Sequence, residues 1–222
     1  MVAAFQARSE RWDRAAESIA MLIERAPDEH RHWCLAAALW ARADDPERYR
    51  QFCRRVLDRY REASDPEIAE RTAKYCLLLP SSGPELEDAD RQAERAAKGA
   101  TGPVEHWAIA AKGLAEYRNG RFADALATIE KAQAAAGNGG EWYFRLPADC
   151  VRAMALMRLG RLDEARTMLE GASTIYRANM PREIAREPSY FWTDLLICEI
   201  LHREAEALIL GDAAFPANPF AP

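Results

Sequence analysis

A thirteen-residue pattern that occurs twice constrains the fold of this chain more than any other feature of its sequence. The two copies are GRFADALATIEKA (120–132) and GRLDEARTMLEGA (160–172), so the offset between them is 40 residues. Both fit the pattern G-x-Φ-x-x-A-x-x-x-Φ-x-x-A, in which Φ is a large apolar residue. The same offset relates Arg118 to Arg158. Self-similarity at a fixed period of this size is typical of repeat architectures, in which one supersecondary unit is stacked several times.

The pattern predicts a helix end, a tight turn and a second helix. Gly120 and Gly160 supply the left-handed backbone conformation that ends a helix and lets the chain reverse. The apolar and alanine positions that follow are three and four residues apart, so they form one stripe along the next helix. Alanine in this stripe lets two helix backbones approach closely. The repeated unit is therefore predicted to be an antiparallel helix pair.

Weaker copies of the stripe occur elsewhere in the sequence. The segment 11–27 contains one that ends at Pro27, and the segments 47–60 and 85–97 contain two more. Aligned on their central small residue, the five copies are 38, 36, 36 and 40 residues apart. We therefore expect about five helix pairs, of which the first is incomplete. The five small anchor residues are Ala15, Cys53, Ala89, Ala125 and Ala165.

Period and pattern together resemble those of tetratricopeptide (TPR) repeats, whose usual unit is a helix pair of about 34 residues. The resemblance implies an all-α fold, in which helical hairpins stack as an elongated, right-handed α-solenoid. Trp33 and Trp107 match the family's tryptophan near the start of a first helix, and Gly113 matches its mid-helix glycine. The spacings exceed those of the family, which predicts insertions in the turns at 43–47, 80–85 and 137–144.

Periodicity, proline and glycine together predict where the helices begin and end. Because proline is tolerated in a first helical turn, Pro66, Pro84 and Pro103 indicate helix starts. The last helix is longer and more apolar than the others, as expected of a helix that covers the end of a stack. The repeat domain is thus expected to span 1–210, followed by a proline-rich coil at 211–222. The helices are expected at 9–26, 30–43, 46–63, 66–79, 85–98, 103–119, 121–136, 146–159, 161–178 and 189–210.

The first of these helices lacks a complete partner. The helix at 9–26 aligns with the second helix of a pair, and the segment 1–8 is too short for a full first helix. Three arrangements are open: residues 1–8 fold back over the helix, a segment upstream of Met1 covers it, or a second copy pairs with it in a weak homodimer. Its apolar stripe is expected to contain Trp12, Ile19, Leu22 and Ile23.

The order of the helices and the ending REAEALILGDAAFPANPF (203–220) resemble the C-terminal repeat regions of large multidomain bacterial serine/threonine kinases and WD-repeat proteins. This resemblance implies a scaffold module within a larger bacterial signalling protein. Neither the HRD nor the DFG signature of a kinase occurs in the sequence, so kinase activity could not reside in it.

Charge and hydropathy exclude several classes of partner. The net charge of -5 argues against general nucleic-acid binding, which needs a basic footprint. The one basic stretch, at 47–61, contains six arginines that share a helix with an apolar stripe. These arginines form either a solvated outer face or a site for an acidic partner. Neither a membrane span nor a signal peptide is evident, so we expect a cytoplasmic protein without membrane contact.

The sequence shows no catalytic constellation. There is no phosphate-cradling glycine loop and no GxSxG elbow. His30 and Cys34 are one helical turn apart, a spacing that suits two metal ligands, but no third ligand is apparent nearby. The five cysteines have no CxxC pair and are expected to be reduced, buried thiols. We therefore expect a non-catalytic protein with neither metal nor cofactor.

The remaining site is the concave face, which the first helix of each pair lines in a TPR stack and which receives a peptide or helix. The leading hypothesis is a protein-interaction scaffold. A sensor for a small effector and a self-association module are the alternatives, and the partner's identity is not encoded in any motif. An alternative interpretation makes Leu114 and Met154 core residues. For Arg118 and Arg158 the alternative is that they cap the C-terminal ends of helices. The expected lining residues are Arg31, Arg42, Arg71, Lys74, Trp107, Leu114, Tyr117, Arg118, Met154, Met157 and Arg158.

Overall fold

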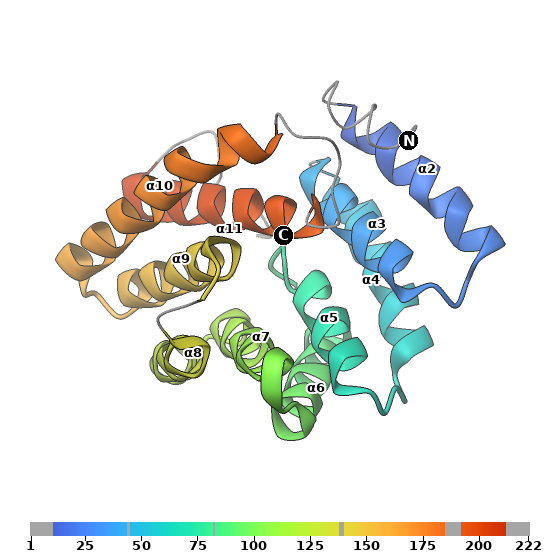
Figure 1. Cartoon of the computed structure of the whole chain (residues 1–222), viewed down its shortest axis with the longest axis horizontal. Helices are drawn as coiled ribbons and strands as arrows, with labels where there is room; N and C mark the ends of the chain where they lie inside the picture. The colour runs from blue at the N-terminus through green and yellow to red at the C-terminus, as the bar shows by residue number, and fades with distance from the viewer. Residues whose placement is uncertain (1–10, 44, 82, 138–139, 185–191, 212–222) are drawn as a thin grey trace.

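The computed structural model describes residues 11–43, 45–81, 83–137, 140–184 and 192–211. Within these ranges the protein forms ten α-helices, one short 3-10 helix and no strand, which confirms the all-α class. None of these helices is both long enough and apolar enough to cross a membrane. With the labels of Figure 1, the helices are α2 (Trp12–Arg25), α3 (His30–Arg42), α4 (Pro46–Tyr60), α5 (Pro66–Cys76), α6 (Pro84–Gly99), η1 (Gly102–Val104), α7 (Glu105–Arg118), α8 (Phe122–Ala136), α9 (Trp142–Arg158), α10 (Leu162–Ile184) and α11 (Trp192–Leu210).

Consecutive helices pack as antiparallel hairpins that follow one another round an arc (Figure 1). The hairpins with the most extensive contact are α5 with α6, α7 with α8, and α9 with α10. Helix α6 also packs on α7, and α8 packs on α9, so that the hairpins join into one stack. The predicted solenoid of helix pairs is therefore present.

The turns of the two clear repeat copies have the same geometry. Gly120 and Gly160 have φ angles of 75° and 76°, in the left-handed region that favours glycine. After each glycine the backbone turns back on the helix that it has just left. The Arg121 N–H donates to the Glu116 carbonyl at 2.9 Å, and the Arg161 N–H donates to the Leu156 carbonyl at 3.0 Å. Both hydrogen bonds span five residues, as in a Schellman helix end.

The small anchor residues lie where two helices touch. Ala125 and Ala165 are fully buried, and the anchors of the three weaker copies, Ala15, Cys53 and Ala89, are also buried. At Gly113 a Cβ atom would lie 2.6 Å from the Cδ1 atom of Ile129, which is too close for real atoms. Gly113 therefore lets the side chain of Ile129 pack against the backbone of α7, and any larger residue there would push Ile129 aside.

Helix α2, the first that the structure describes, departs from the predicted stripe at Leu22. It packs against α3 and buries Ile19 and Ile23. The inclusion of Leu22 in the stripe was wrong, since 40% of Leu22 is exposed together with 57% of Met21. Ile23 thus has a partner within the protein. The weak homodimer through this helix stays a prediction.

Helix α9 begins at Trp142, four residues before the predicted start, and contains Pro147. A proline inside a helix leaves the carbonyl four residues earlier without its usual N–H donor. Here that carbonyl belongs to Tyr143, and it accepts a contact from the thiol of Cys198 at 3.5 Å instead. Tertiary contact with α11 compensates for the proline, which sequence periodicity alone does not reveal.

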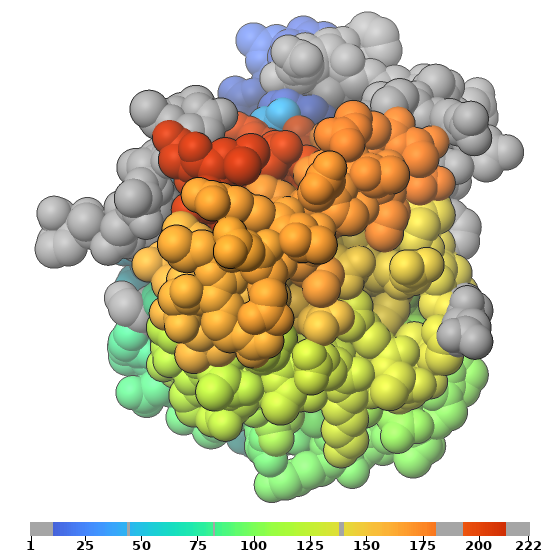
Figure 2. Space-filling view, turned by 90° about the vertical axis from the view of Figure 1, so that its left-hand side faces the viewer, coloured from blue at the N-terminus to red at the C-terminus, as the bar shows by residue number. Residues whose placement is uncertain are grey.

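Helix α11 is present as predicted, but it does more than cover the end of the stack. It packs on α9 and α10 and then crosses the inner side of the arc to reach α3 (Figure 1). From the α10 side it reaches the surface only as a small area (red in Figure 2). The expected elongated shape is absent for this reason. A compact monomer of 25.0 kDa exposes about 10,000 Å² and this protein exposes 11150 Å².

Candidate functional site on the concave face

One half of the concave face is filled by α11. The Arg42 guanidinium lies 2.8 Å from the Glu199 carboxylate of α11. The side chain of Arg118 is only 2% exposed and donates to Glu204 at 2.7 Å, as well as to the carbonyls of Leu77 and Leu78. Arg42 and Arg118 therefore face the groove as predicted, but the protein's own helix occupies the place of a partner.

Three further predicted residues belong to the core. Leu114, Tyr117 and Met154 are buried, so they offer no surface to a partner. The core alternative holds for Leu114 and Met154. Met157 is half-buried against the core, while Arg158 is exposed at the end of α9. The repeat register predicted all five residues on the inner face of the arc. Helix α11 and the neighbouring helices cover three of them.

The other half of the concave face is an open cleft of about 350 Å³. Its walls come from the N-terminal half of α3, from one face along α5, from η1 and the start of α7, and from the first turns of α9 and α11. Four predicted residues line it: Arg31, Arg71, Lys74 and Trp107. The cleft is thus the part of the concave face where the sequence prediction and an accessible surface coincide.

Lys74 lies in this cleft and carries a charge in a nearly buried place. Its side chain is 13% exposed, and its Nζ atom lies 2.8 Å from Glu70 Oε1 and 4.8 Å from the centre of the Trp107 ring. Burial opposes the charge, but the carboxylates of Glu70 and Asp194 outweigh it and raise the pKa of Lys74. The ammonium therefore stays charged at neutral pH.

Asp194, in the first turn of α11, also lines the cleft and was missed from the sequence. Burial raises the pKa of its carboxyl group, and the opposing influence of Lys74 is smaller. Its sequence position places Asp194 on the last helix, away from the first helices of the pairs. Only the passage of α11 across the arc brings it beside Lys74.

An aromatic wall forms one side of the cleft. The rings of Trp107 and Tyr143 stack with centroids 6.0 Å apart and an angle of 15° between their planes. Phe144 meets Trp107 edge-on from behind, at 4.9 Å. Tyr143 also escaped the sequence prediction, because the glycines before it indicate an inserted turn at 137–144 rather than the start of α9.

A serine, a histidine and a glutamate lie in series between α10 and α11. Ser173 Oγ is 2.9 Å from His202 Nε2, and His202 Nδ1 is 3.5 Å from a Glu206 oxygen. This order resembles that of a hydrolytic triad. Ser173 is nevertheless buried within α10, where backbone N–H groups bond inside the helix, and the ring of Tyr176 stacks on His202 at 4.3 Å. The series joins two helices and offers a substrate no access.

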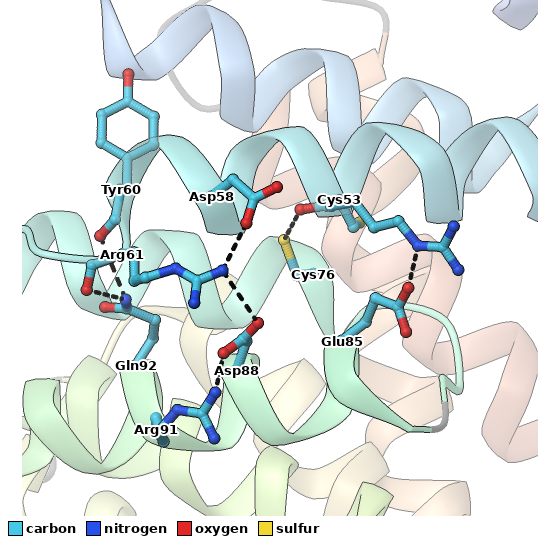
Figure 3. Close-up of polar contacts among 10 residues, drawn as sticks. Cys53, Asp58, Tyr60, Arg61, Cys76, Glu85, Asp88, Arg91 and Gln92 are labelled. Carbon is cyan, nitrogen blue, oxygen red and sulfur yellow. Dashed lines mark hydrogen bonds and ion pairs between the residues drawn. The ribbon is translucent and has the colours of Figure 1, made fainter.

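The arginines of the basic stretch contact carboxylates of neighbouring helices. On the outer side of the arc, Arg54 of α4 pairs with Glu85 of α6, and Arg61 lies 3.8 Å from Asp88 (Figure 3). Arg59 pairs with Asp28 at 2.5 Å. These contacts favour the interpretation of the stretch as an outer face over that of a site for an acidic partner.

His30 and Cys34 do form a contact, but their surroundings suit a buried polar cluster. Cys34 Sγ is 3.7 Å from His30 Nδ1, and His30 Nε2 is 3.1 Å from the Thr72 hydroxyl. Burial raises the pKa of the Cys34 thiol, which disfavours the thiolate that a metal needs. Among the described residues, no three His, Cys, Asp or Glu side chains are grouped so as to hold a metal ion.

Stacked helical hairpins around a concave face define a TPR-like helical-repeat protein. The structure is similar to the crystal structure of PilW, described as a widely conserved type IV pilus biogenesis factor, with a TM-score of 0.54 and 18% sequence identity over 98% of this chain and 93% of that one. No protein-family model and no curated protein sequence matches this sequence. At this identity the likeness to PilW concerns the fold.

Proposed function

We propose that this protein is a non-catalytic protein-interaction module that holds a segment of a partner protein in the concave cleft. The observation that carries the proposal is the cleft itself. It is the open remainder of a concave face that α11 otherwise fills, and it contains Arg31, Arg71, Lys74 and Trp107. Arginine and aromatic side chains are enriched at the centres of protein interfaces.

The burial of α11 opposes its displacement by a partner. Six leucine and isoleucine side chains of this helix are buried. At about 1.5–3 kcal/mol for each large apolar side chain, their burial contributes about 9–18 kcal/mol. That range matches or exceeds the whole stability of a typical domain, about 5–15 kcal/mol. A partner therefore binds beside α11, and not in its place.

A photo-crosslinking amino acid in the cleft tests the proposal. Leu35 and Val104 both line the cleft and are partly exposed, so either position tolerates the replacement. Arg91, on the exposed side of α6, is the matched control. We expect crosslinks from the cleft positions to a defined protein in the source cell and none from position 91. Equal crosslinking from both surfaces would contradict a cleft-specific site.

A small effector is the second candidate, and the size of the cleft favours it. Sites for small molecules have volumes of about 300–1,000 Å³, and this cleft of about 350 Å³ lies at the lower end. Mass spectrometry of the protein purified under non-denaturing conditions separates the two candidates. A bound molecule of a few hundred daltons would favour the effector.

The wider setting is proposed from the sequence resemblance. We place the module in the cytoplasm, as part of a larger bacterial signalling protein. The fold shared with PilW supports an alternative setting, that of a biogenesis factor. Detection of the tagged, full-length protein in cell fractions, with sequencing of its gene on both sides of this segment, tests both settings.

A further inference from the structure

We propose that the ligand of the concave cleft is an extended polypeptide segment, whose backbone carbonyl accepts a hydrogen bond from Lys74 and whose backbone N–H donates one to Asp194. This inference rests on the proposed function, because it names the chemistry that the cleft recognises. It goes beyond that function by assigning two positions and by excluding a helical ligand.

Lys74 has hydrogen-bonding capacity that the fold does not use. An ammonium group has three N–H donors. Among the described residues, its one ion-pair partner is Glu70, and the rings of Trp107 and Tyr75 provide only cation–π contacts. A nearly buried charge is costly unless it is hydrogen-bonded. The group therefore favours a ligand that brings an acceptor oxygen into the cleft.

Asp194 supplies the complementary half. Its carboxylate accepts hydrogen bonds and cannot donate them. Within the described residues no hydrogen bond or close ion pair reaches it, although Lys74, Arg71 and Glu70 act on its charge. An ionised carboxylate in this place favours a donor N–H. Lys74 thus has N–H donors to spare and Asp194 has acceptor oxygens to spare, and both line the same cleft.

The charge balance selects a neutral ligand group. The cations Arg31, Arg71 and Lys74 are matched by the carboxylates of Glu67, Glu70 and Asp194. Neither a strongly acidic nor a strongly basic ligand gains from such a lining. A peptide group carries no net charge and presents one acceptor and one donor.

The ligand's backbone must be extended to offer these groups. In an α-helix the backbone N–H and carbonyl groups already bond to each other. In an extended segment both are available, and successive side chains point in opposite directions. One side chain of such a segment would then lie against the wall of Trp107 and Tyr143, which is suited to an apolar or aromatic residue.

Selection of linear peptides from a random displayed library against the complete protein provides the probe. The strongest binder is synthesised, and its dissociation constant is measured by calorimetry. The variant Glu70→Gln/Lys74→Met removes both charges of the buried pair, so that Glu70 is not left as an unpaired carboxylate. Its control is Glu94→Gln/Lys112→Met. This variant removes an ion pair that lies outside the cleft, in which Lys112 Nζ is 2.9 Å from a Glu94 carboxylate oxygen. Asp194→Leu has its control in Asp149→Leu, another largely buried carboxyl position.

We expect each cleft variant to weaken binding at least tenfold, because each hydrogen bond involves a charged group. The controls should change it less than twofold. Replacement of single peptide amides by esters, which removes one N–H at a time, should identify one position whose loss weakens binding to the wild type but adds nothing in Asp194→Leu. Circular dichroism confirms that each variant is folded.

Three results would overturn the inference. In the first, Trp107→Ala abolishes binding while the Lys74 and Asp194 variants do not; the cleft is then the binding site, but without amide recognition. In the second, no ester position matters and a charged or carboxamide side chain of the peptide is required instead. In the third, selection yields no peptide that binds, and the proposed function falls with the inference.

Discussion

Two halves of one concave face differ in what covers them. Arg42 and Arg118 lie under α11 and bond to its glutamates, while Arg71 and Lys74 line an open cleft. All four come from the first helices of their pairs and were predicted to face the inner side of the arc. Register therefore tells which side of a repeat stack a residue faces, and the path of a distant helix decides whether that residue is available to a partner.

The largest expected effect falls on the covered half. Arg118→Met leaves Glu204 and the carbonyls of Leu77 and Leu78 without their donor. Breaking a buried pair in this way costs about 3–5 kcal/mol. Urea unfolding measures the loss, and the repeat-equivalent Arg158→Met should cost at most about 1 kcal/mol, because Arg158 is exposed. Equal losses at the two positions would show that the contacts of Arg118 with α11 and the end of α5 add no stability.

A pH effect is expected at His30, which is buried between α3 and α5. Burial lowers the pKa of His30 to about 4, and the charge of Arg71 contributes in the same direction. The carboxylates of Glu29 and Asp65 act in the opposite direction but have a smaller effect. The unfolded protein takes up this proton near pH 6.5, so the stability from His30 is complete above pH 6.5. It is lost as the pH falls toward 4, by about 3 kcal/mol.

The variant His30→Gln isolates this contribution from the carboxylates and other histidines that titrate in the same range. From pH 7 to pH 4 the wild type should lose more unfolding free energy than the variant does. A difference that is constant over this range would show that His30 is accessible to protons in the folded protein.

The sequence defined the stack better than it defined the site. Gly120, Gly160 and the alanine stripe are local determinants, since a left-handed residue and a small side chain act on adjacent turns. Asp194 and Tyr143 entered the cleft through contacts between segments far apart in the sequence. Leu22 was misplaced because three- and four-residue spacings fit two neighbouring faces of one helix, and only packing on α3 selects Ile23.

A middle-sized effect is expected at the repeat anchors, which both halves share. Ala125→Leu and Ala165→Leu each insert a large side chain at a fully buried helix contact and should cost about 1–3 kcal/mol. Ala127→Leu is the control, because Ala127 is exposed on the same helix as Ala125. Melting temperatures that are unchanged for both anchor variants would contradict the repeat register.

The smallest effect on stability is expected in the open half. Arg71 pairs with Glu67 within its own helix and is partly exposed, so Arg71→Ala should cost about 0.3–0.5 kcal/mol. A loss as large as that of Arg118→Met would mean that the cleft residues, like those under α11, serve the fold rather than a partner.

Amide hydrogen exchange tests most directly whether α11 is a permanent occupant of the concave face. In the free protein, the amides of α11 should exchange only through global unfolding, at the slow rate of the α7–α8 hairpin. With a bound peptide, added protection should fall on the segments that line the cleft, which are the first half of α3, helix α5, the start of α7 and the first turns of α9 and α11. Rapid exchange throughout α11, or loss of its protection when the peptide binds, would show that the helix is displaced and would contradict the division of the concave face.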